Sequence, residues 1–480
     1  MGPTDIFLDG ESLTPYDVVS VVRGGATVAL DPVARARVEA TARAVQQAVA
    51  WRPVYGATTG VGANRDVVAE RAGHGQRILL SHATAGGDAL PDEVARAVLV
   101  VRANQLAAGG SGTRAEVLDG LVVAIGLGAA PLLHGYTGIG TGDLSALAEL
   151  GLQLAGELPW RSGAPPVVAL TDLDVLPFLS STAATVAQAI VAAIDLAELL
   201  TATYPVTALS FVALGGNPEA FDARVHEARP QPGQAEAAKA VRDLLAGGRP
   251  TTPLRIQDPF GLRSFPQVHG PAVHALDRLL EVLTIELNSR AENPLVVRTE
   301  AGGDVLHHGN WHGAPVALAL DSARLALHSV ASLSVARTAS LMNPDLTALT
   351  SFLAEGPAGS SGAMGVEYVQ HAALARLRSL AAPASLSTAR MSRGAEDHAS
   401  FSTEAARLTG ESVQPFRTVL ACELVTATRA LRLAGAKPAD LLPSGVGEAY
   451  QRAYDELPPD LGDRPLTIDI AKAEALLVAR

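Results

Sequence analysis

The chain has 480 residues, a net charge of −12 and no block of like charge, which excludes the basic surface of a nucleic-acid-binding protein. Hydrophobic residues make up 48% of it and aromatic residues only 4%, so Ala, Leu and Val must build the core, which favours closely packed helices. A single cysteine, Cys422, excludes an internal disulfide framework.

The N-terminal segment and the longest apolar stretch bear on the protein's location. The segment MGPTDIFLDG has no basic region followed by an apolar run, so we expect a cytoplasmic protein. Asp195 and Glu198 interrupt the apolar stretch from Val186 to Leu214, which predicts a buried helix rather than a membrane span. Cys422 suits a reducing compartment, and we expect it to pack as a small hydrophobic residue in a helix.

The first half of the chain mixes helices with glycine-rich turns. These turns fall at residues 56–62, 109–112 and 138–142. Glycine allows backbone angles that other residues avoid, and loops built in this way commonly carry function. We therefore expect functional loops at these three places.

The second half is strongly helical. The segment from Pro315 to Met342 has no internal Gly or Pro and is followed by Asn343-Pro344, so it predicts one long helix with clear start and stop signals. Val273 to Glu286 and Pro415 to Leu433 have the same character. Helices this rich in Ala and Leu must cover one another's apolar faces, so the pattern predicts a long bundle.

The segment Gly140-Thr141-Gly142-Asp143 can react with itself. The amide nitrogen of Gly142 can attack the carbonyl carbon of Gly140 and close a five-membered ring, because glycine permits the close approach. Loss of the central hydroxyl would then leave an electrophilic alkene. From Thr141 this alkene carries a methyl group, which makes it bulkier and less electrophilic than the product of a serine. The alternative is an ordinary loop capped by Asp143 before a helix at Leu144.

Several further motifs accompany this loop and together resemble the aromatic amino acid ammonia-lyase and aminomutase family, most closely its histidine-specific members. The resemblance extends from about Leu13 to about Ala430. In chain order the motifs are Arg52-Pro-Val-Tyr55-Gly-Ala-Thr-Thr-Gly-Val-Gly62, Ser81-His82-Ala-Thr-Ala-Gly86, Arg102-Ala-Asn104-Gln-Leu106, Gln257-Asp-Pro-Phe-Gly-Leu-Arg263, Pro266-Gln-Val-His-Gly270, Glu286-Leu-Asn-Ser289, Asn293-Pro294, Gly309-Asn-Trp-His-Gly313 and Glu396-Asp-His398.

The resemblance implies a fold and an assembly. It implies a mostly α, fumarase/aspartase-like helical bundle with a mainly helical N-terminal domain. We place that domain at residues 1–200, with the Tyr55 loop and the Gly140-Thr141-Gly142 loop, and the central bundle at 201–480. It further implies a homotetramer in which three subunits share each active site.

Three residues are candidates for catalysis by resemblance. Tyr55 corresponds to the base that removes a β-proton, although a phenol with a pKa near 10 needs a nearby cation or hydrogen-bond donors to act at neutral pH. Arg263 corresponds to the residue that holds the substrate carboxylate, for which a planar guanidinium is suited. Asn310 corresponds to a residue near the cofactor. The structural alternatives are a core tyrosine, a surface ion pair and a helix cap.

Other positions correspond to the substrate pocket. Glu396 corresponds to a pocket carboxylate of the histidine-specific members and is the fourth candidate for catalysis. Together with His82, it would suit a substrate with a polar side chain. A structural histidine is the alternative for His82. The remaining pocket candidates are Ser81, Phe178, Gln257, Phe260 and Trp311.

The chain departs from the family pattern around the electrophile. Thr141 replaces the serine that becomes the methylidene-imidazolone group (MIO), and Phe260 replaces a tyrosine. The family's Asn-Gly-Thr motif is expected at about Phe178-Leu179-Ser180, and its asparagine is absent. Ala395 and Trp311 replace a glutamine and a phenylalanine. The polar support of the electrophile is thus reduced, while the base and the carboxylate clamp remain.

These departures predict an enzyme of this family that works without MIO, with no other cofactor and no metal. Tyr55 would drive an elimination, addition or cyclisation on an amino-acid-derived carboxylate, in specialised biosynthesis. Free histidine, phenylalanine and tyrosine would release little ammonia. The alternatives are an ammonia-lyase or aminomutase with a Thr-derived MIO, and a non-catalytic scaffold or partner subunit. The partner is a small amino-acid-like molecule, with neither nucleic acid nor membrane.

Overall fold

A computed structural model describes residues 5–70, 72–247, 253–297 and 303–478 of the chain. Helices dominate it, which confirms the predicted mostly α fold. The chain forms two compact units, and each contains several separate stretches. Unit 1 consists of Met1–Ile194, Leu279–Asp321 and Pro383–Gly410, and unit 2 consists of Asp195–Arg278, Ser322–Ala382 and Glu411–Arg480.

Unit 1 combines helices with three short two-stranded sheets among its described residues. Strands β1 (Asp5–Leu8) and β2 (Thr27–Leu30) pair in parallel, while β3 (Gly86–Ala89) with β4 (His134–Tyr136) and β5 (Leu295–Val297) with β6 (Asp304–Leu306) are antiparallel. Its helices are α1 (Pro15–Gly24), α2 (Pro32–Ala48), η1 (Gly62–Asn64), α3 (His74–His82), α4 (Asp92–Ala107), α5 (Ala115–Gly126), α6 (Leu144–Leu154), α7 (Val175–Leu179), η4 (Ala384–Leu386) and η5 (Ser392–Gly394).

Local signals in the sequence set the ends of these helices. Thr14 caps α1 in a reciprocal capping box with Asp17, Pro15 occupies the first turn, and Gly25 ends the helix in the left-handed conformation. Helix α4 has no polar face, because thirteen of its residues from Val94 to Ala107, including Arg102 and Gln105, are buried. A helix that is buried on all sides can hold polar side chains against the segments that surround it.

Four long helices contain residues of both units: α8 (Ala183–Ala213), α12 (Phe265–Leu287), α13 (Ala314–Leu341) and α16 (Ser402–Leu433). The predicted helix at Pro315 is α13, but α12 and α16 begin earlier than predicted and contain Pro271 and Pro415 in their interiors. Proline usually marks a helix start because it lacks an N–H, yet packing along a long helix outweighs one lost hydrogen bond.

Two stretches are long and apolar enough to cross a membrane by length and composition alone, Val175–Ala213 and Ala314–Leu341. The apolar windows of these stretches are 78% and 56% buried inside the protein, respectively. Most of the first window is buried, as the charges at Asp195 and Glu198 predict for that stretch.

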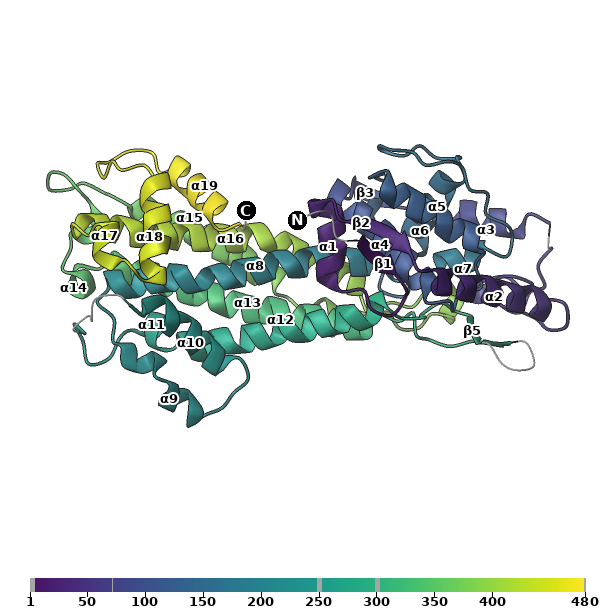
Figure 1. Ribbon diagram of the computed structural model, residues 1–480, viewed down its shortest axis with the longest axis horizontal. Coiled ribbons are helices and arrows are strands. Elements are labelled where there is room, and N and C mark those ends of the chain that lie inside the picture. The colour runs from purple at the N-terminus through teal and green to yellow at the C-terminus, as the bar shows by residue number, and fades with distance from the viewer. Residues whose placement is uncertain (1–4, 71, 248–252, 298–302, 479–480) are drawn as a thin grey trace. The chain divides into compact units, whose positions relative to one another are not determined.

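Unit 2 is a helical bundle (Figure 1). It contains a buried ion pair. Arg337 of α13 binds both carboxylate oxygens of Glu423 on α16 at 2.6 and 2.8 Å, and Ser210 of α8 donates to the same carboxylate at 2.7 Å. The shorter elements of this unit are η2 (Pro218–Phe221), α9 (Ala223–Glu227), α10 (Gln234–Leu245), α11 (Phe260–Arg263), α14 (Pro344–Thr347), η3 (Ser351–Leu353), α15 (Met364–Leu380), α17 (Pro438–Leu441), α18 (Gly445–Glu456) and α19 (Thr467–Leu476).

His269 joins α12 to α8 in the core of this bundle. Its Nε2 lies 2.5 Å from the hydroxyl of Thr203, and its ring packs 4.6 Å from the rings of Tyr204 and Phe265. Burial lowers the pKa of His269 from 6.5 to about 3, so the buried ring is neutral at physiological pH.

We expect His269 to make the protein less stable in mild acid. Between pH 6.5 and about 3 the His269 side chain binds a proton in the unfolded chain but stays neutral in the folded chain. The free energy of unfolding therefore falls as the pH falls. Urea unfolding of His269→Gln at pH values across this range should show a flatter dependence. The matched control is His274→Gln, on the exposed face of the same helix, which should keep the wild-type slope.

Candidate active site

Unit 1 contains a cavity of about 450 Å³ that brings together several predicted site residues. Tyr55, Thr141, Trp311 and Glu396 line it, although they come from four separate stretches of the sequence. Its remaining lining residues are Pro53, Thr59, Gly62, Arg65, Asp66, Gly142, Leu144, Leu176, Ser180, Asn293, His307 and Ala395.

The hydroxyl of Tyr55 is held by the turn that follows it. The backbone N–H of Gly62 donates to this oxygen at 2.8 Å, and the ring of His307 lies edge-on to the Tyr55 ring at 6.4 Å. Burial raises the pKa of Tyr55, and so does the carboxylate of Glu396, while the Gly62 N–H and the cation of Arg65 lower it. Burial is the largest of these effects, so the pKa of Tyr55 lies above its usual value of 10, and the Gly62 N–H and Arg65 offset only part of the rise.

A second contact joins the Tyr55 turn to the segment that carries Glu396. The N–H of Ala63 donates to the hydroxyl of Ser392 at 2.8 Å, and the N–H of Met391 donates to the carbonyl oxygen of Glu396 at 2.7 Å. Gly62 has a φ of 57°, and a Cβ there would lie 2.5 Å from the Ser392 hydroxyl, so the close approach of the two segments favours glycine.

The carbonyl group of Gly140 has two hydrogen-bond donors. The hydroxyl of Ser400 donates to its oxygen at 2.7 Å and the N–H of Gly313 at 3.1 Å. Gly140 and Gly142 have φ values of 82° and 101°, which favour glycine, and a Cβ on Gly140 would lie 2.1 Å from the Ser400 hydroxyl. The loop thus adopts backbone angles that favour glycine at both positions, and its first glycine packs closely against Ser400.

Asp143 fixes the other end of this loop. Its N–H donates to the carbonyl oxygen of Ser181 at 2.7 Å, and its buried carboxylate accepts from the N–H and hydroxyl of Thr185 at 2.7 and 2.8 Å. Burial raises the pKa of Asp143, whereas the bonds from Thr185 lower it. The side chain makes no capping bond to α6, so its carboxylate ties the loop to α8 rather than capping the helix that follows.

A second cavity lies on unit 1 and shares Thr141, Gly142, Leu144 and Glu396 with the first. His82 lines it, and its Nδ1 lies 2.8 Å from the carbonyl oxygen of Ile78. We assign the proton to Nδ1 because a carbonyl only accepts, which leaves Nε2 as an acceptor. Ser81 is exposed, and its hydroxyl also donates to the Ile78 carbonyl, at 3.1 Å. The remaining lining residues are Gly135, Tyr136, Thr137, Gly138, Ile139, Met391, Thr403, Glu404 and Arg407.

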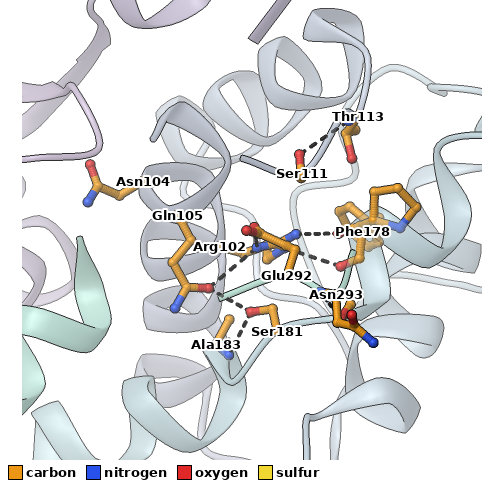
Figure 2. Close-up of polar contacts among 12 residues, drawn as sticks. Arg102, Asn104, Gln105, Ser111, Thr113, Phe178, Ser181, Ala183, Glu292 and Asn293 are labelled. Atoms are coloured by element: carbon orange, nitrogen blue, oxygen red, sulfur yellow. Dashed lines mark hydrogen bonds and ion pairs between the residues drawn. The ribbon is translucent and has the colours of Figure 1, made fainter. Parts of the chain in front are cut away.

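Figure 2 shows buried polar residues around Arg102, which were not predicted from the sequence as part of the site. Arg102 is fully buried and donates to the Glu292 carboxylate at 2.9 Å and to the carbonyl oxygens of Phe178 and Pro177 at 3.1 and 2.7 Å. Burial raises the pKa of Glu292 and the ion pair with Arg102 lowers it. Arg102 therefore joins Pro177-Phe178 to Glu292, which lies far from them in the sequence.

The two segments that Arg102 joins form part of the cavity wall. The N–H of Asn293 donates to the hydroxyl of Ser180 at 2.9 Å, and both residues line the cavity. Phe178 is fully buried instead, with its ring 5.9 Å from the Arg102 guanidinium carbon. Ser180, rather than Phe178, thus occupies the wall here. The motifs that contain Arg102 and Asn293 were the only signal in the sequence for this network.

Trp311 and Asn310 lie in the loop after β6. Trp311 lines the first cavity, and its indole N–H donates to the carbonyl oxygen of His308 at 3.0 Å. Asn310 is exposed, and its backbone N–H donates to Nδ1 of His308 at 3.0 Å. The loop is therefore ordered around the imidazole of His308.

The predicted carboxylate clamp belongs to unit 2. Arg263 donates through Nε to the carbonyl oxygen of Asp258 at 3.0 Å, and its guanidinium carbon lies 4.6 Å from the centre of the Phe260 ring. Phe260 is 66% exposed and Gln257 is also exposed. The guanidinium thus lies over an aromatic face in a cation–π arrangement.

Known proteins resemble the chain over nearly its full length. Residues 13–458 match the family described as aromatic amino acid lyase. Histidine ammonia-lyase of Symbiobacterium thermophilum is 38% identical, over 96% of this chain and 94% of that protein, and the enzyme of Geobacillus thermodenitrificans is 36% identical over 98% and 97%.

Solved structures resemble it to a similar extent. Tyrosine aminomutase from Streptomyces globisporus has a TM-score of 0.92 at 26% identity, covering 99% of this chain and 96% of that one. The ergothioneine-degrading enzyme ergothionase from Treponema denticola has a TM-score of 0.91 at 25% identity, covering 98% of both chains.

We expect the Arg102→Met variant to be strongly destabilised, because it leaves the Glu292 carboxylate buried without its partner. Losing one partner of a buried ion pair costs about 3–5 kcal/mol, which urea unfolding would measure. Adding Glu292→Gln should recover part of the loss, since the buried charge is then gone. The control is Lys239→Met in the exposed pair with Asp243, for which we expect a change of about 1 kcal/mol or less. Equal losses in the two single variants would contradict this account.

Proposed function

The chain belongs to the aromatic amino acid lyase family of carbon–nitrogen lyases, and we propose that it uses Tyr55 as a base without an MIO electrophile. The substrate is an amino-acid-derived carboxylate, and the reaction is an elimination or a related addition or cyclisation. The observation that carries this proposal is that Tyr55, Glu396 and Thr141 line one cavity.

Enzymes of this family normally depend on MIO, which accepts the substrate amine and so makes it a better leaving group. Gly140, Thr141 and Gly142 would form the group here, and the donors on the Gly140 carbonyl fit ring closure. Thr141 fits the electrophile poorly, because its extra methyl group would cover the carbon that must bond to the amine. We therefore propose a reaction whose leaving group departs without that bond.

The chain's own residues then have distinct roles in the proposal. Tyr55 removes a proton next to the substrate carboxylate, assisted by the Gly62 N–H on its oxygen. Arg263 binds the carboxylate, and Asn310 belongs to the same site by family resemblance. His82 and Glu396 accept hydrogen bonds from a polar or cationic side chain. The similar structure of an ergothioneine-degrading enzyme supports the proposal of a substrate other than a common amino acid.

A second candidate is an ammonia-lyase or aminomutase that uses a Thr-derived ring. The Gly140 carbonyl favours it, since two donors at 2.7 and 3.1 Å polarise the carbon that ring closure attacks. The two candidates differ in the covalent structure of residues 140–142, which can be measured directly.

We expect the intact mass of the purified protein to equal that of its unmodified chain. Ring formation would remove two waters, so the second candidate predicts a protein lighter by about 36 Da. The matching activity measurement follows urocanate, cinnamate and coumarate by ultraviolet absorbance with concentrated protein and free histidine, phenylalanine or tyrosine. We expect little product from any of the three. A protein lighter by that amount that also forms much product would contradict the first proposal and support the second candidate.

The pKa of Tyr55 should respond to the two charges beside it. Glu396→Gln removes a negative charge that raises this pKa, so it should fall, while Arg65→Gln removes a cation that lowers it, so it should rise. The measurement is the alkaline titration of phenolate absorbance, taken as the difference from Tyr55→Phe. Asp345→Asn, an exposed change in unit 2, is the control and should leave the difference curve unchanged. A Tyr55 curve that neither charge shifts would contradict the proposed role of its surroundings.

A further inference from the structure

We propose that Ser400 and the N–H of Gly313 form a preassembled pair of donors that promotes ring closure of the Gly140-Thr141-Gly142 loop, and that Thr141 alone prevents it. The inference rests on the proposed function only in taking the wild-type loop to be open. It assigns Ser400, which no motif in the sequence identified, as a positioning residue for a self-modification of the backbone.

The geometry is that of an oxyanion hole. When the Gly142 nitrogen attacks the Gly140 carbonyl carbon, negative charge develops on the carbonyl oxygen. That oxygen already accepts from the Ser400 hydroxyl at 2.7 Å and from the Gly313 N–H at 3.1 Å, distances at which donors stabilise such a charge. Gly140 and Ser400 are both buried, so water does not weaken these bonds.

The orientation of the Ser400 hydroxyl follows from its other neighbour. The N–H of Ser402 donates to the Ser400 oxygen at 3.3 Å, so the hydroxyl hydrogen is free to point at the Gly140 carbonyl. Asp143 fixes the far side of the loop through its bond to Ser181 at 2.7 Å. The Gly140 carbonyl group and the Asp143 end of the loop are thus both held in place. Thr141, which lies between them, is the residue whose side chain differs from the family pattern.

The covalent step balances without any external reagent. A bond forms between the Gly142 nitrogen and the Gly140 carbonyl carbon, and the nitrogen's proton ends on the former carbonyl oxygen. This hydroxyl leaves as the first water with the amide hydrogen of residue 141. The second water takes the Cα hydrogen and the side-chain hydroxyl of residue 141. Residue 141 gives up its amide hydrogen, its Cα hydrogen and its hydroxyl in these steps. Threonine is β-branched, so it restricts χ1 and adds a methyl group beside the reacting atoms, whereas serine does neither, which is why we assign the block to Thr141.

Ser402 provides a matched control for Ser400. Its hydroxyl is buried in the same cluster, near the positions that a Cβ on Gly140 or Gly313 would occupy, at 2.7 and 2.2 Å. It has no hydrogen-bond partner among the described residues, so it makes no bond to the Gly140 carbonyl. A change at Ser402 therefore alters packing beside the loop without removing a donor.

The test is the intact mass of four variants followed over time after purification, with circular dichroism and thermal melting as checks of folding. We expect Thr141→Ser to become lighter by about 36 Da and Thr141→Ser/Ser402→Ala to do the same. Thr141→Ser/Ser400→Ala should form the ring about 100-fold or more slowly, the usual effect of losing one oxyanion donor. Thr141→Ser/Ser400→Cys keeps the volume with a weaker donor and should be slowed as well, which keeps the test decisive should the alanine variant not fold.

Either of two results would overturn the proposal. One is a Thr141→Ser protein that keeps its full mass, since the donor pair would then be insufficient. The other is a folded Ser400 variant that closes the ring as fast as Thr141→Ser itself. Neither result bears on the proposed function, which depends on the mass and products of the unaltered chain.

Discussion

The site in unit 1 depends on one buried cation. Arg102 lies in a helix with no exposed face, and removing a guanidinium from water costs several kcal/mol unless acceptors replace the solvent. Glu292 and the carbonyl oxygens of Pro177 and Phe178 supply those acceptors. Because the arginine requires all of them, it fixes two segments far apart in the sequence, and the cavity wall at Ser180 and Asn293 forms where they meet.

The reactive loop is constrained from both ends in a similar manner. Its first carbonyl is bound by Ser400 and Gly313, and the N–H after its last glycine is bound by Ser181. Every one of these contacts involves backbone atoms of the loop, so none depends on the identity of its central side chain. The loop can therefore keep its shape whichever residue stands at position 141.

The sequence predicted the fold and the family, and both predictions are confirmed. Its motifs also included Tyr55, Thr141, Trp311 and Glu396, which line one cavity. It did not predict the Ser180–Asn293 contact or the role of Ser400, because such pairs arise only when distant segments meet. The roles of Tyr55 and Arg263 remain predictions, since they depend on a substrate.

The extended starts of α12 and α16 have a related cause. Pro271 and Pro415 carry a local stop signal, but helix formation over these lengths depends on packing that a short window of sequence does not contain. Local sequence patterns thus located the helices but placed the starts of α12 and α16 too late. Likewise, they located the site motifs but not the contacts between those motifs.

The surroundings of Tyr55 suggest how a poor base becomes a usable one. Burial and the Glu396 carboxylate both raise the pKa of Tyr55, whereas the Gly62 N–H and Arg65 lower it. A substrate whose cationic side chain neutralises Glu396 removes one of the two opposing effects and adds a positive charge near the phenol. Binding of the proposed substrate would then lower the pKa of the base that acts on it, whereas a neutral substrate would leave Tyr55 protonated. Glu396 would in this way have two effects, because it would bind the cationic side chain of the substrate and, once neutralised by it, would allow Tyr55 to remove the proton.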